Sequence, residues 1–577
     1  MRTCLFLVAA GLFATSTGFA QTASSHHTAA RTQKVRVSTV VPDVIFFNGV
    51  IYTGAGFAED KPQTMEAMAV GGGKVLAVGK TTEVMKFAGP HTRLRDLDSA
   101  NTSTFIFPGF NDAHTHLGGA GRTKLNIDLT GVKSLAAMLD TIGDAAKASP
   151  ADHWLTGGNW DHTLWTQKVL PTRQDLDKVT GGHPTFLDRI DGHIAIANSA
   201  ALAAAGITGK TKAPQGGAID LDASGEPTGI LRESAQGLVY KEIPPPSHDE
   251  RRRGDELAIN DALAHGVTSV QDFSSWDDFL VFEEMEKEGK LDLRISEWLP
   301  FKDSLEELEK MRAHHDANDP LLHTGMLKGF MDGSLGSRTA AMKAPFADDA
   351  ANTGLPQFDQ PELNKLAEER AKAGFQLGFH AIGDKAAAMA LDAYAQAAVS
   401  RTARNRIEHA QVVDAADIPR FAKLGVIASM QPNHLLTDMN WAEDRLGAQR
   451  AAYSYAWKAF LDAGVPLAFG TDYPVEPVTP FRGLYAAVTR KNEAGTKEYF
   501  PANKLTRGQA LYAYTQGSAY AEFAEKRKGK LISGFDADFI LVDRDLYKVA
   551  AAAILHTKVL STYVGGREAI AGEAAPQ

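Results

Sequence analysis

Four segments that lie far apart in the sequence each end a short apolar run with a side chain that binds metal ions. The first run ends in the triplet His114-Thr115-His116, and the others end at His380, His409 and Asp472. Side chains alternate along an extended strand, so both imidazoles of an H-x-H triplet point to the same side. Imidazole and carboxylate groups suit borderline divalent metals. If the runs are neighbouring strands of one closed parallel sheet, these five side chains can face one metal centre.

The middle of the chain alternates strand-like runs with helical stretches, which predicts repeated βα units. We place eight strands at residues 105–110, 267–272, 291–298, 326–331, 376–380, 406–409, 426–431 and 466–472. Eight such units fit an α/β fold of the TIM type, a (β/α)8 barrel, in which reactive groups lie at the carboxyl ends of the strands. We therefore predict a metal-dependent barrel over residues 104–527.

A long insertion separates the first two predicted strands. Residues 125–246 are far more than one connecting helix needs, and they include Trp154, Trp160 and Trp165 and a Gly/Pro-rich stretch. Connections between neighbouring elements are normally short, so a segment of this size must have a structure of its own. We predict an inserted subdomain that forms a lid over the mouth of the barrel.

Both ends of the ordered chain have β character. A hairpin signal, Asn48-Gly49 between apolar runs, appears near the start, and strand-like runs such as 538–543 recur near the end. The two terminal segments are short, so we predict one small β-sandwich built from residues 42–103 together with residues 528–577. Two separate β-domains are the alternative.

The first 20 residues have the pattern of a cleavable export signal. Arg2 supplies a positive charge, an apolar run too short to span a bilayer follows, and small residues precede Ala20. We expect cleavage after Ala20 and a periplasmic or secreted protein. Cleavage removes Cys4, the only cysteine, so the mature chain would use no disulfide. Residues 21–41 are polar and are expected to be disordered.

The overall charge limits the partners. The formal net charge is −10 and the pI is near 6.0, which argues against nucleic acid and anionic membrane surfaces. After the signal, no segment is long and apolar enough to span a membrane. A small-molecule substrate is the expected partner. A homodimer stays open, because related barrels are often dimeric and no symmetric patch is recognisable in the sequence.

At this point the chain resembles the amidohydrolase superfamily. Within it, the chain is similar to the branch that contains N-substituted formamide deformylase and the YtcJ-like hydrolases, amidohydrolase family 3. The resemblance covers nearly all of the mature chain. The motifs that carry it are FPGFNDAHTH at 107–116, DGH at 191–193, KGFMDGSLGSRT at 328–339, and the segments ending at His380, His409 and Asp472.

The resemblance implies a role for each ligand position. His114 and His116 would hold the more buried of two divalent ions, and His380 and His409 would hold the second. Lys328, at the end of the fourth strand, is similar to the family lysine that is carbamylated and bridges the two ions. Reaction with CO2 converts an ammonium group, which cannot bind a cation, into an anionic oxygen ligand.

Asp472, on the last strand, would contact the metal and act as the general base. It would take a proton from the attacking water and pass it to the departing nitrogen. Asp472 could instead only orient a ligand histidine, and Lys328 could pair with Asp472 or Asp332. One or two Zn²⁺ ions are the expected cofactor, although Fe²⁺, Mn²⁺ and Co²⁺ suit the same ligands. A bound Zn²⁺ lowers the pKa of water toward about 7 and polarises a carbonyl.

His193 in the insertion is a second candidate catalytic residue. Either His193 or the second metal would stabilise the tetrahedral oxyanion, and Asp191 could orient the His193 ring. The alternative is an ordinary structural histidine, because an isolated histidine more often serves the fold.

Four residues are candidates for substrate binding. Ser334 and Arg338 lie in the glycine-rich loop after the fourth strand, which could hold a substrate carboxylate. The alternative is a tight loop whose arginine anchors the lid. Trp160, with Trp165 and Phe110, could form an aromatic wall, although tryptophans are more often plain core. His434 follows the seventh strand and could line the pocket.

These patterns predict hydrolysis of an amide-type C–N bond, such as an N-acyl or N-formyl amide, in a small molecule. A water activated by the metal would attack, with Asp472 as base. An ester, lactone or carbamate could be cleaved by the same site. A periplasmic ligand-binding protein without catalysis is the remaining alternative, and the full set of ligand positions argues against it.

Overall fold

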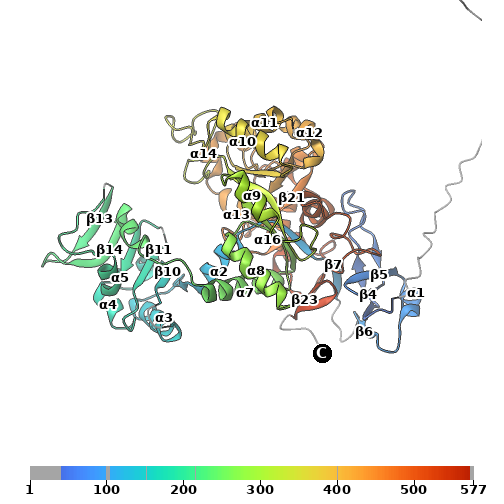
Figure 1. Ribbon diagram of the computed structural model, residues 1–577, viewed down its shortest axis with the longest axis horizontal. Coiled ribbons are helices and arrows are strands. Elements are labelled where there is room, and N and C mark those ends of the chain that lie inside the picture. Colours follow the sequence, from blue (N-terminus) through green and yellow to red (C-terminus); the bar gives the residue numbers. More distant parts are fainter. Residues whose placement is uncertain are drawn as a thin grey trace, which may run out of the picture. The chain divides into compact units, whose positions relative to one another are not determined.

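A sheet of eight parallel strands forms the centre of the computed structural model (Figure 1). In chain order these are β8 (Phe110–Thr115), β15 (Val267–Asp272), β16 (Arg294–Pro300), β17 (Leu322–Phe330), β18 (Leu377–Ala381), β19 (Arg406–His409), β20 (Ile427–Met430) and β21 (Leu467–Phe469). Beyond β21, the N–H of Asp472 donates to the carbonyl of His114 and the N–H of His116 donates to the carbonyl of Tyr473, both at 2.8 Å. The last strand thus joins the first, which confirms the predicted (β/α)8 barrel.

The structure describes residues 40–98, 104–150, 153–190, 192–214, 216–398 and 400–571. The described residues from Val40 onward belong to one unit. The predicted export signal, nearly all of the predicted disordered segment and Asp191 lie outside the described residues. Within the described ranges, no helix is both long enough and apolar enough to cross a bilayer.

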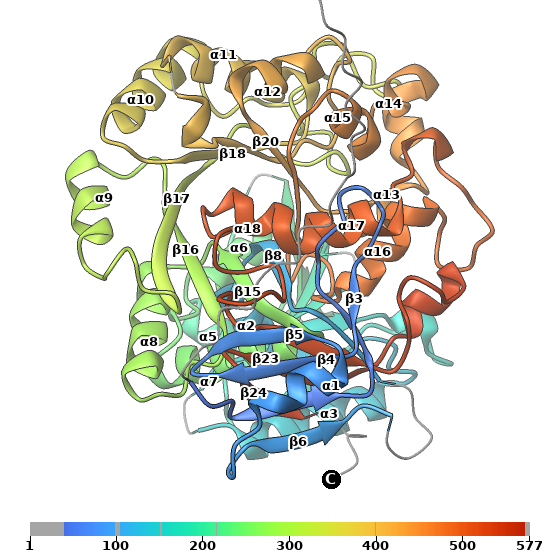
Figure 2. The same ribbon diagram turned by 90° about the vertical axis from the view of Figure 1, so that its right-hand side faces the viewer.

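Helices follow the strands around the barrel (Figure 2). Four of them begin with a capping box; in three of these the serines Ser247, Ser275 and Ser304 accept a backbone N–H and an acidic side chain reaches back. All six residues of β15 are buried, as a sheet covered by helices requires. The helices are α2 (Leu117–Leu125), α7 (His248–Ala264), α8 (Trp276–Lys287), α9 (Leu305–Arg312), α10 (Gln360–Lys372), α11 (Asp384–Gln396), α12 (Ile418–Leu424), α13 (Asn433–Asp438), α14 (Ala442–Ala451), α15 (Trp457–Asp462), α16 (Pro480–Thr489), α17 (Arg507–Tyr512) and α18 (Ser518–Ala521).

The prediction of a single first strand at 105–110 is wrong. The structure has two strands there, and they are separated at Gly109. β7 (Phe105–Pro108) belongs to another sheet, and the barrel strand β8 starts at Phe110. A Cβ atom on Gly109 would lie 2.3 Å from the side chain of Thr268, so only glycine fits at the crossing. The metal-binding histidines still end the barrel strand, because β8 continues the same extended segment. Other strand boundaries differ from the prediction by a few residues.

Strands from both ends of the chain form a sandwich of two sheets beside each other in Figure 2. Phe46 of the first sheet packs edge-on against Phe539 at 5.1 Å between ring centroids, and Phe539 stacks on Tyr563 at 4.4 Å. The two ends therefore share one apolar core, as the predicted fold class requires. The first sheet contains β1 (Val44–Phe47), β4 (Ala67–Gly71), β5 (Lys74–Gly79) and β6 (Arg93–Asp96), and the second contains β2 (Val50–Tyr52), β3 (Thr64–Met65), β7, β22 (Phe539–Val542), β23 (Val559–Val564) and β24 (Arg567–Ala571).

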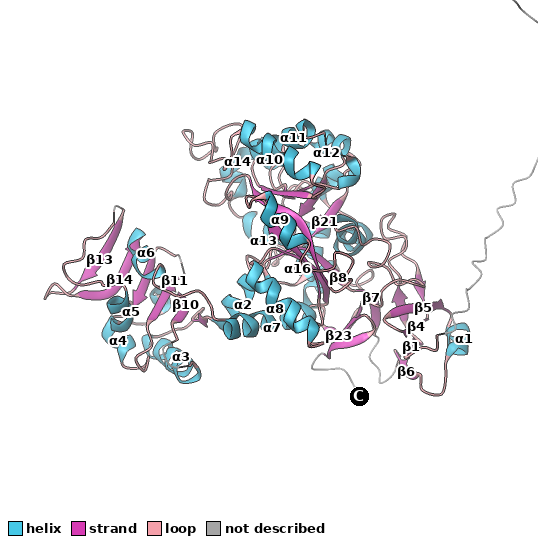
Figure 3. Cartoon of the chain, in the orientation of Figure 1, coloured by secondary structure: helices cyan, strands magenta, loops and turns pink. Residues whose placement is uncertain are grey.

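The insertion between α2 and α7 has its own six-stranded sheet and its own helices (Figure 3). Its core packs Trp160 and Trp165 with aliphatic residues such as Ile142 and Leu187. The strands are β9 (Ile127–Asp128), β10 (Leu155–Trp160), β11 (Thr185–Arg189), β12 (Ile194–Ala197), β13 (Gly217–Leu221) and β14 (Pro227–Glu233), and the helices are α3 (Leu135–Ala148), α4 (Arg173–Asp177), α5 (Ser199–Ala204) and α6 (Gly237–Tyr240). An inserted subdomain is therefore present, and its role as a lid stays a prediction.

Candidate metal centre

Two histidines from β8 and the residue after it face the same carboxylate. The fully buried His114 ring places Nδ1 2.7 Å from Glu408 Oε2 and Nε2 3.6 Å from Asp472 Oδ1. The His116 ring places Nδ1 2.9 Å from the carbonyl of Phe273 and Nε2 3.1 Å from Asp472 Oδ1. The Nε2 atoms of both rings therefore face Asp472, as expected for two ligands of one ion.

Asp472 follows β21 in a left-handed backbone conformation, with φ of 63°. Such a conformation costs on the order of 1–3 kcal/mol in a non-glycine residue and concentrates at functional sites. The turn is held by Asp112, which accepts hydrogen bonds from the Thr471 N–H at 2.9 Å and hydroxyl at 2.6 Å. The second oxygen of Asp472 lies 3.4 Å from His434 Nε2. Burial alone would raise the pKa of Asp472, but the facing histidines, first His114, lower it well below its usual value.

His409 ends β19, also with a left-handed backbone, φ 70°. Its ring centroid lies 4.8 Å from that of His114 and 4.5 Å from that of His380, and its ring is nearly parallel to His434 at 5.9 Å. Burial, together with the nearby His380, lowers the pKa of His409 well below its usual value. The ring is therefore neutral and able to bind a cation.

His380 at the end of β18 adjoins this cluster. Its Nε2 lies 3.1 Å from the carbonyl of Gly333, so the proton sits there and Nδ1 is the free nitrogen. Burial and the charge of Lys328 lower the pKa of His380 to about 4. Asp332 Oδ1 lies 3.5 Å from the same Nε2, and burial raises the pKa of the Asp332 carboxyl group to about 7. Its carboxyl group accepts backbone N–H groups from Ala341, Ile382 and Gly383.

Lys328 on β17 is buried beside the histidines. Its Nζ lies 3.0 Å from His114 Nε2 and 4.9 Å from the centre of the Phe330 ring. Among the described residues, no carboxylate oxygen lies within the 4.0 Å that defines an ion pair with Lys328, so the alternative pairing with Asp332 or Asp472 does not form. Burial lowers the pKa of Lys328 to about 8.

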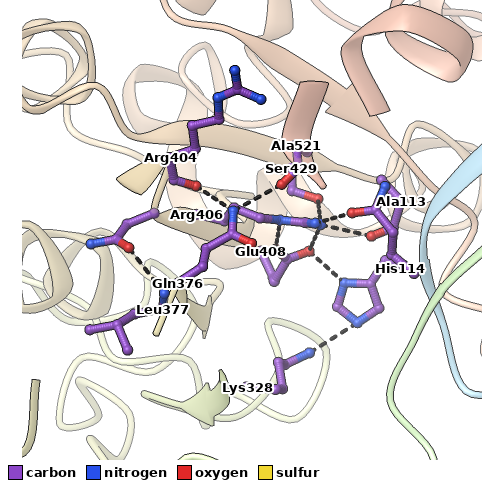
Figure 4. A network of polar contacts seen from close by, with 12 residues as sticks. Ala113, His114, Lys328, Gln376, Leu377, Arg404, Arg406, Glu408, Ser429 and Ala521 are labelled. Atoms are coloured by element: carbon purple, nitrogen blue, oxygen red, sulfur yellow. Dashed lines mark hydrogen bonds and ion pairs between the residues drawn. The ribbon is translucent and has the colours of Figure 1, made fainter. Parts of the chain in front are cut away.

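Beneath His114 lies a buried charged pair that the sequence analysis missed (Figure 4). Arg406 and Glu408 alternate with Ile407 on β19 and are 1% and 0% exposed. Arg406 Nε donates to Glu408 Oε1 at 2.7 Å, and Glu408 Oε2 faces His114. The R-x-E-H pattern at 406–409 was the available signal, because two opposite charges inside a barrel strand are unusual in a packed barrel interior.

At the carboxyl ends of the barrel strands, two groups of ligand atoms are close enough to hold metal ions. One group is His114, His116 and Asp472, the other is His409, His434 and Asp472, and the ligand atoms of each lie within 4.8 Å of one another. Asp472 Oδ1, His409 Nδ1 and His434 Nε2 are buried atoms without a hydrogen-bond partner, which a cation would satisfy. Burial lowers the pKa of His114 and of His409 well below the usual value, and Asp472 is ionised; these are the protonation states that bind divalent metals. Burial alone would lower the pKa of His434, but the facing Asp472 raises it. The donor set fits one or two such ions.

Comparisons with known proteins agree with this geometry. The sequence model described as "Amidohydrolase family" matches residues 104–570. The chain belongs to the amidohydrolase family. YtcJ of Bacillus subtilis is 33% identical over 534 residues, which cover 91% of this chain and 98% of that protein. The N-substituted formamide deformylase of Arthrobacter pascens is 28% identical over 555 residues and covers 92% of this chain and 98% of its own length.

A solved structure extends the match to the whole fold. The crystal structure of an uncharacterized metal-dependent hydrolase from Pyrococcus furiosus is 30% identical, with a TM-score of 0.73, and covers 88% of this chain and 100% of that chain. The resemblance inferred from the motifs is thereby confirmed. The chain is accordingly a hydrolase of the amidohydrolase family with an α/β barrel.

Two residues predicted for the site, Trp160 and His193, belong to the insertion and have hydrogen-bond partners within it. Trp160 is fully buried in the core of the insertion, where its Nε1 donates to the carbonyl of Leu187 at 2.9 Å. It is core and not a pocket wall, because no face of the ring is open to a substrate. His193 pairs its Nδ1 with Glu233 at 3.1 Å, and its side chain is 66% exposed. Among the described residues, the groups that could hold a metal do not include His193.

The loop after β17 is also different from its predicted role. Arg338 forms a two-pronged ion pair with Asp348, with Nη2 2.9 Å and Nε 3.1 Å from the carboxylate oxygens. This ion pair occupies the Arg338 guanidinium, the group that was expected to hold a substrate carboxylate. The Ser334 hydroxyl lies 2.7 Å from that of Ser337, inside the loop. Both contacts favour the alternative of a tight loop, but Arg338 pairs with Asp348 of the same loop and not with the insertion. His434, in contrast, is brought to the centre beside Asp472.

Proposed function

We propose that this amidohydrolase cleaves an amide-type C–N bond of a small molecule. The observation that carries the proposal is the pair of ligand groups that share Asp472 at the carboxyl ends of the barrel strands. The name of the Arthrobacter relative supports an N-acyl or N-formyl amide as the substrate class. Zn²⁺ is the proposed metal, because the donors are imidazoles and a carboxylate.

The chain's own residues supply the proton transfers. A bound divalent ion would lower the pKa of a water molecule and polarise the substrate carbonyl. Asp472 is ionised and is placed to take a proton from the attacking water and return it to the departing nitrogen. The other oxygen of Asp472 lies 3.4 Å from His434 Nε2, and both residues belong to the second group of candidate ligands. The strained backbone of Asp472 keeps the group aimed at the centre before substrate arrives.

Lys328 is proposed as a bridging ligand after reaction with CO2. The amine and CO2 form a carbamate and release one proton, which gives an anionic oxygen ligand in place of a cation. The supporting observations are the contact of 3.0 Å with His114 and the lack of a carboxylate ion pair with Lys328 within the described residues. The mass gain of one CO2 on Lys328, read in the intact folded protein, tests this proposal.

The decisive experiment pairs metal analysis with matched substrates. Metal per chain is measured by plasma mass spectrometry, the metal is removed with a strong chelator, and it is then restored. Activity is measured on amides and esters that share the same acyl group. We expect amide hydrolysis that is lost on chelation and returns with the metal. Ester or lactone cleavage alone would replace the proposed bond class, and bound metal without any turnover would favour a binding protein.

Export is proposed as well, on the N-terminal pattern ending at Ala20. Sequencing the N-terminus of protein from the periplasmic fraction tests it. A start at Gln21 is expected, and an intact N-terminus in the cytoplasmic fraction would contradict it.

A further inference from the structure

Glu408 is completely buried, and both oxygens of its carboxylate have polar partners. Oε1 accepts from Arg406 Nε at 2.7 Å, and Oε2 accepts from Arg406 Nη2 at 3.2 Å. Oε2 also lies 2.7 Å from His114 Nδ1. An ionised carboxylate only accepts hydrogen bonds, so His114 must carry its proton on Nδ1. The contact therefore decides which nitrogen of a candidate metal ligand has the free lone pair.

A second contact assigns the same proton position independently. Before the reaction with CO2 proposed above, Lys328 Nζ lies 3.0 Å from His114 Nε2, and the ammonium form of a lysine only donates. Nε2 is therefore the acceptor, on the side of the ring that faces Asp472. Both neighbours of the ring agree on its tautomer, as Figure 4 shows from close by.

Arg406 holds Glu408 in place by tying the strands of the barrel together. Its Nη2 donates to the carbonyl of Ala113 on β8 at 2.7 Å and to the hydroxyl of Ser429 on β20 at 2.8 Å, and its Nη1 donates to Gln271 on β15. Three other strands thus fix the guanidinium of β19. A buried ion pair is usually no more stable than apolar residues of the same size. Its presence here points to a role other than stability.

A pocket lies next to the Arg406–Glu408 pair, on the side away from the candidate ligands. A cavity of about 470 Å³ lies at the starts of the barrel strands, and Arg406, Gln271 and Trp298 form part of its lining. Arg406 is still only 1% exposed and its guanidinium lies 4.9 Å from the centre of the Trp298 ring, so this ring and the hydrogen bonds together set its position. The orientation of Glu408 therefore depends on the charged contacts described above.

We propose that Glu408, held by Arg406, is a positioning residue that keeps the proton of His114 on Nδ1 and its Nε2 lone pair free for a divalent metal. This inference rests on the metal use proposed above. Carboxylates in this position typically change metal affinity by about 10–100-fold when they are removed. Metal affinity, rather than stability, is the property that separates this role from a structural one.

The test compares Glu408→Gln with a matched control, Glu297→Gln. Glutamine keeps the shape but places an N–H group against the donors of Arg406 or His114. Glu297 is equally buried, on β16, and accepts from the Ser274 N–H at 2.8 Å. Among the described residues, no hydrogen bond or ion pair joins Glu297 to a candidate ligand. Zn²⁺ affinity of each metal-free protein is measured by competition with a chromophoric chelator.

We expect Glu408→Gln to bind Zn²⁺ about 10–100-fold more weakly than the wild type, and Glu297→Gln to bind it like the wild type. Equal affinity in Glu408→Gln, or an equal loss in Glu297→Gln, overturns the inference. A wild-type chain that binds no Zn²⁺ overturns the proposed function itself, so the two failures are distinguishable.

A measurement on the wild-type protein tests the inference even if Glu408→Gln does not fold. The ¹⁵N chemical shifts of the His114 ring, in metal-free wild-type protein labelled at histidine, report which nitrogen is protonated. A protonated Nδ1 is expected. A protonated Nε2 overturns the inference.

Discussion

The interior of the barrel and the interior of the insertion are both closed to solvent, but they are filled with opposite chemistry. Inside the barrel, Arg406, Glu408, Lys328 and Asp472 are all at most 5% exposed. Inside the insertion, the buried cluster is made of aliphatic residues and the tryptophans Trp160 and Trp165. Burying charge is costly unless it is paired or binds a ligand, whereas burying apolar surface stabilises directly. The barrel interior therefore has the chemistry expected of a ligand site, whereas the buried cluster of the insertion has the chemistry of an ordinary apolar core.

The largest expected effect is in the barrel. Asp472→Asn keeps the shape of the side chain but cannot take a proton, so kcat/KM on an amide substrate should fall by about 10²–10⁴-fold. Steady-state kinetics check this, with metal per chain measured on the same sample. Unchanged kcat/KM at full metal content would mean that Asp472 only orients a ligand.

The next effect is on the stability of the insertion. Trp160 is 0% exposed, and Trp160→Ala should cost about 3–5 kcal/mol, because it leaves a cavity in the core. Calorimetry of thermal unfolding measures the loss. Leu164→Ala is the control, since Leu164 is 47% exposed and should change little. If Trp160→Ala instead left stability intact and raised KM, the tryptophan would be a substrate wall after all.

On the outside of the barrel, the cost of burying charge can be tested at Asp255, a buried acid whose Oδ2 has no hydrogen-bond partner among the described residues. Asp255 on α7 is 1% exposed, and burial, aided by the charges of Asp278 and Asp272, raises its pKa from 3.8 to about 9. The folded state keeps the proton and the unfolded state loses it above pH 4. Stability is therefore lost as pH rises toward 9, by at most about 1.4 kcal/mol per pH unit.

Asp255→Asn cannot ionise, so it should be more stable than the wild type at pH 8, by a margin that shrinks toward pH 4. Tm at pH 5 and pH 8 measures both margins. Asp249→Asn, on the same helix but 96% exposed, is the control and should show no such pH dependence. A margin for Asp255→Asn that does not change with pH would mean that Asp255 is ionised in the folded protein.

The smallest expected effect is at His193. Exposed ion pairs contribute little, so His193→Ala should change stability by less than about 0.5 kcal/mol and leave metal content unchanged. Metal analysis and kinetics on the same variant check this. A tenfold fall in kcat with normal metal content would restore the oxyanion role and would mean that the insertion reaches the centre during turnover.

How much the sequence predicts differs between the two regions for a physical reason. The ends of parallel strands meet at one edge, so the positions of His114, His380, His409 and Asp472 follow from strand order alone. Trp160 had no such constraint, because a tryptophan in a segment without clear periodicity can face a pocket or a core. The local pattern therefore could not decide its role.

One residue at the centre, Glu408, escaped prediction, and another, His434, was predicted to line the pocket but not to contact Asp472. Glu408 was overlooked because a charge within an apolar strand shows its partner only in three dimensions. The contact of His434 with Asp472 also needed the structure, since α13 begins just after β20 and turns the ring inward. In both cases the missing information is the direction of a side chain, which sequence spacing does not give.

The pairing of β22 with β7 has a consequence for how the chain is made. Phe539 lies opposite Pro108, so β7, the strand that leads directly into the barrel, cannot pair with β22 until residues near 539 have been synthesised. At 5–20 residues per second, roughly 20 to 90 seconds separate the synthesis of the two strands. Over that time the edge of β7 is open to other extended segments. The nascent chain therefore has its greatest risk of misassociation at its beginning, and the last residues to be synthesised remove it.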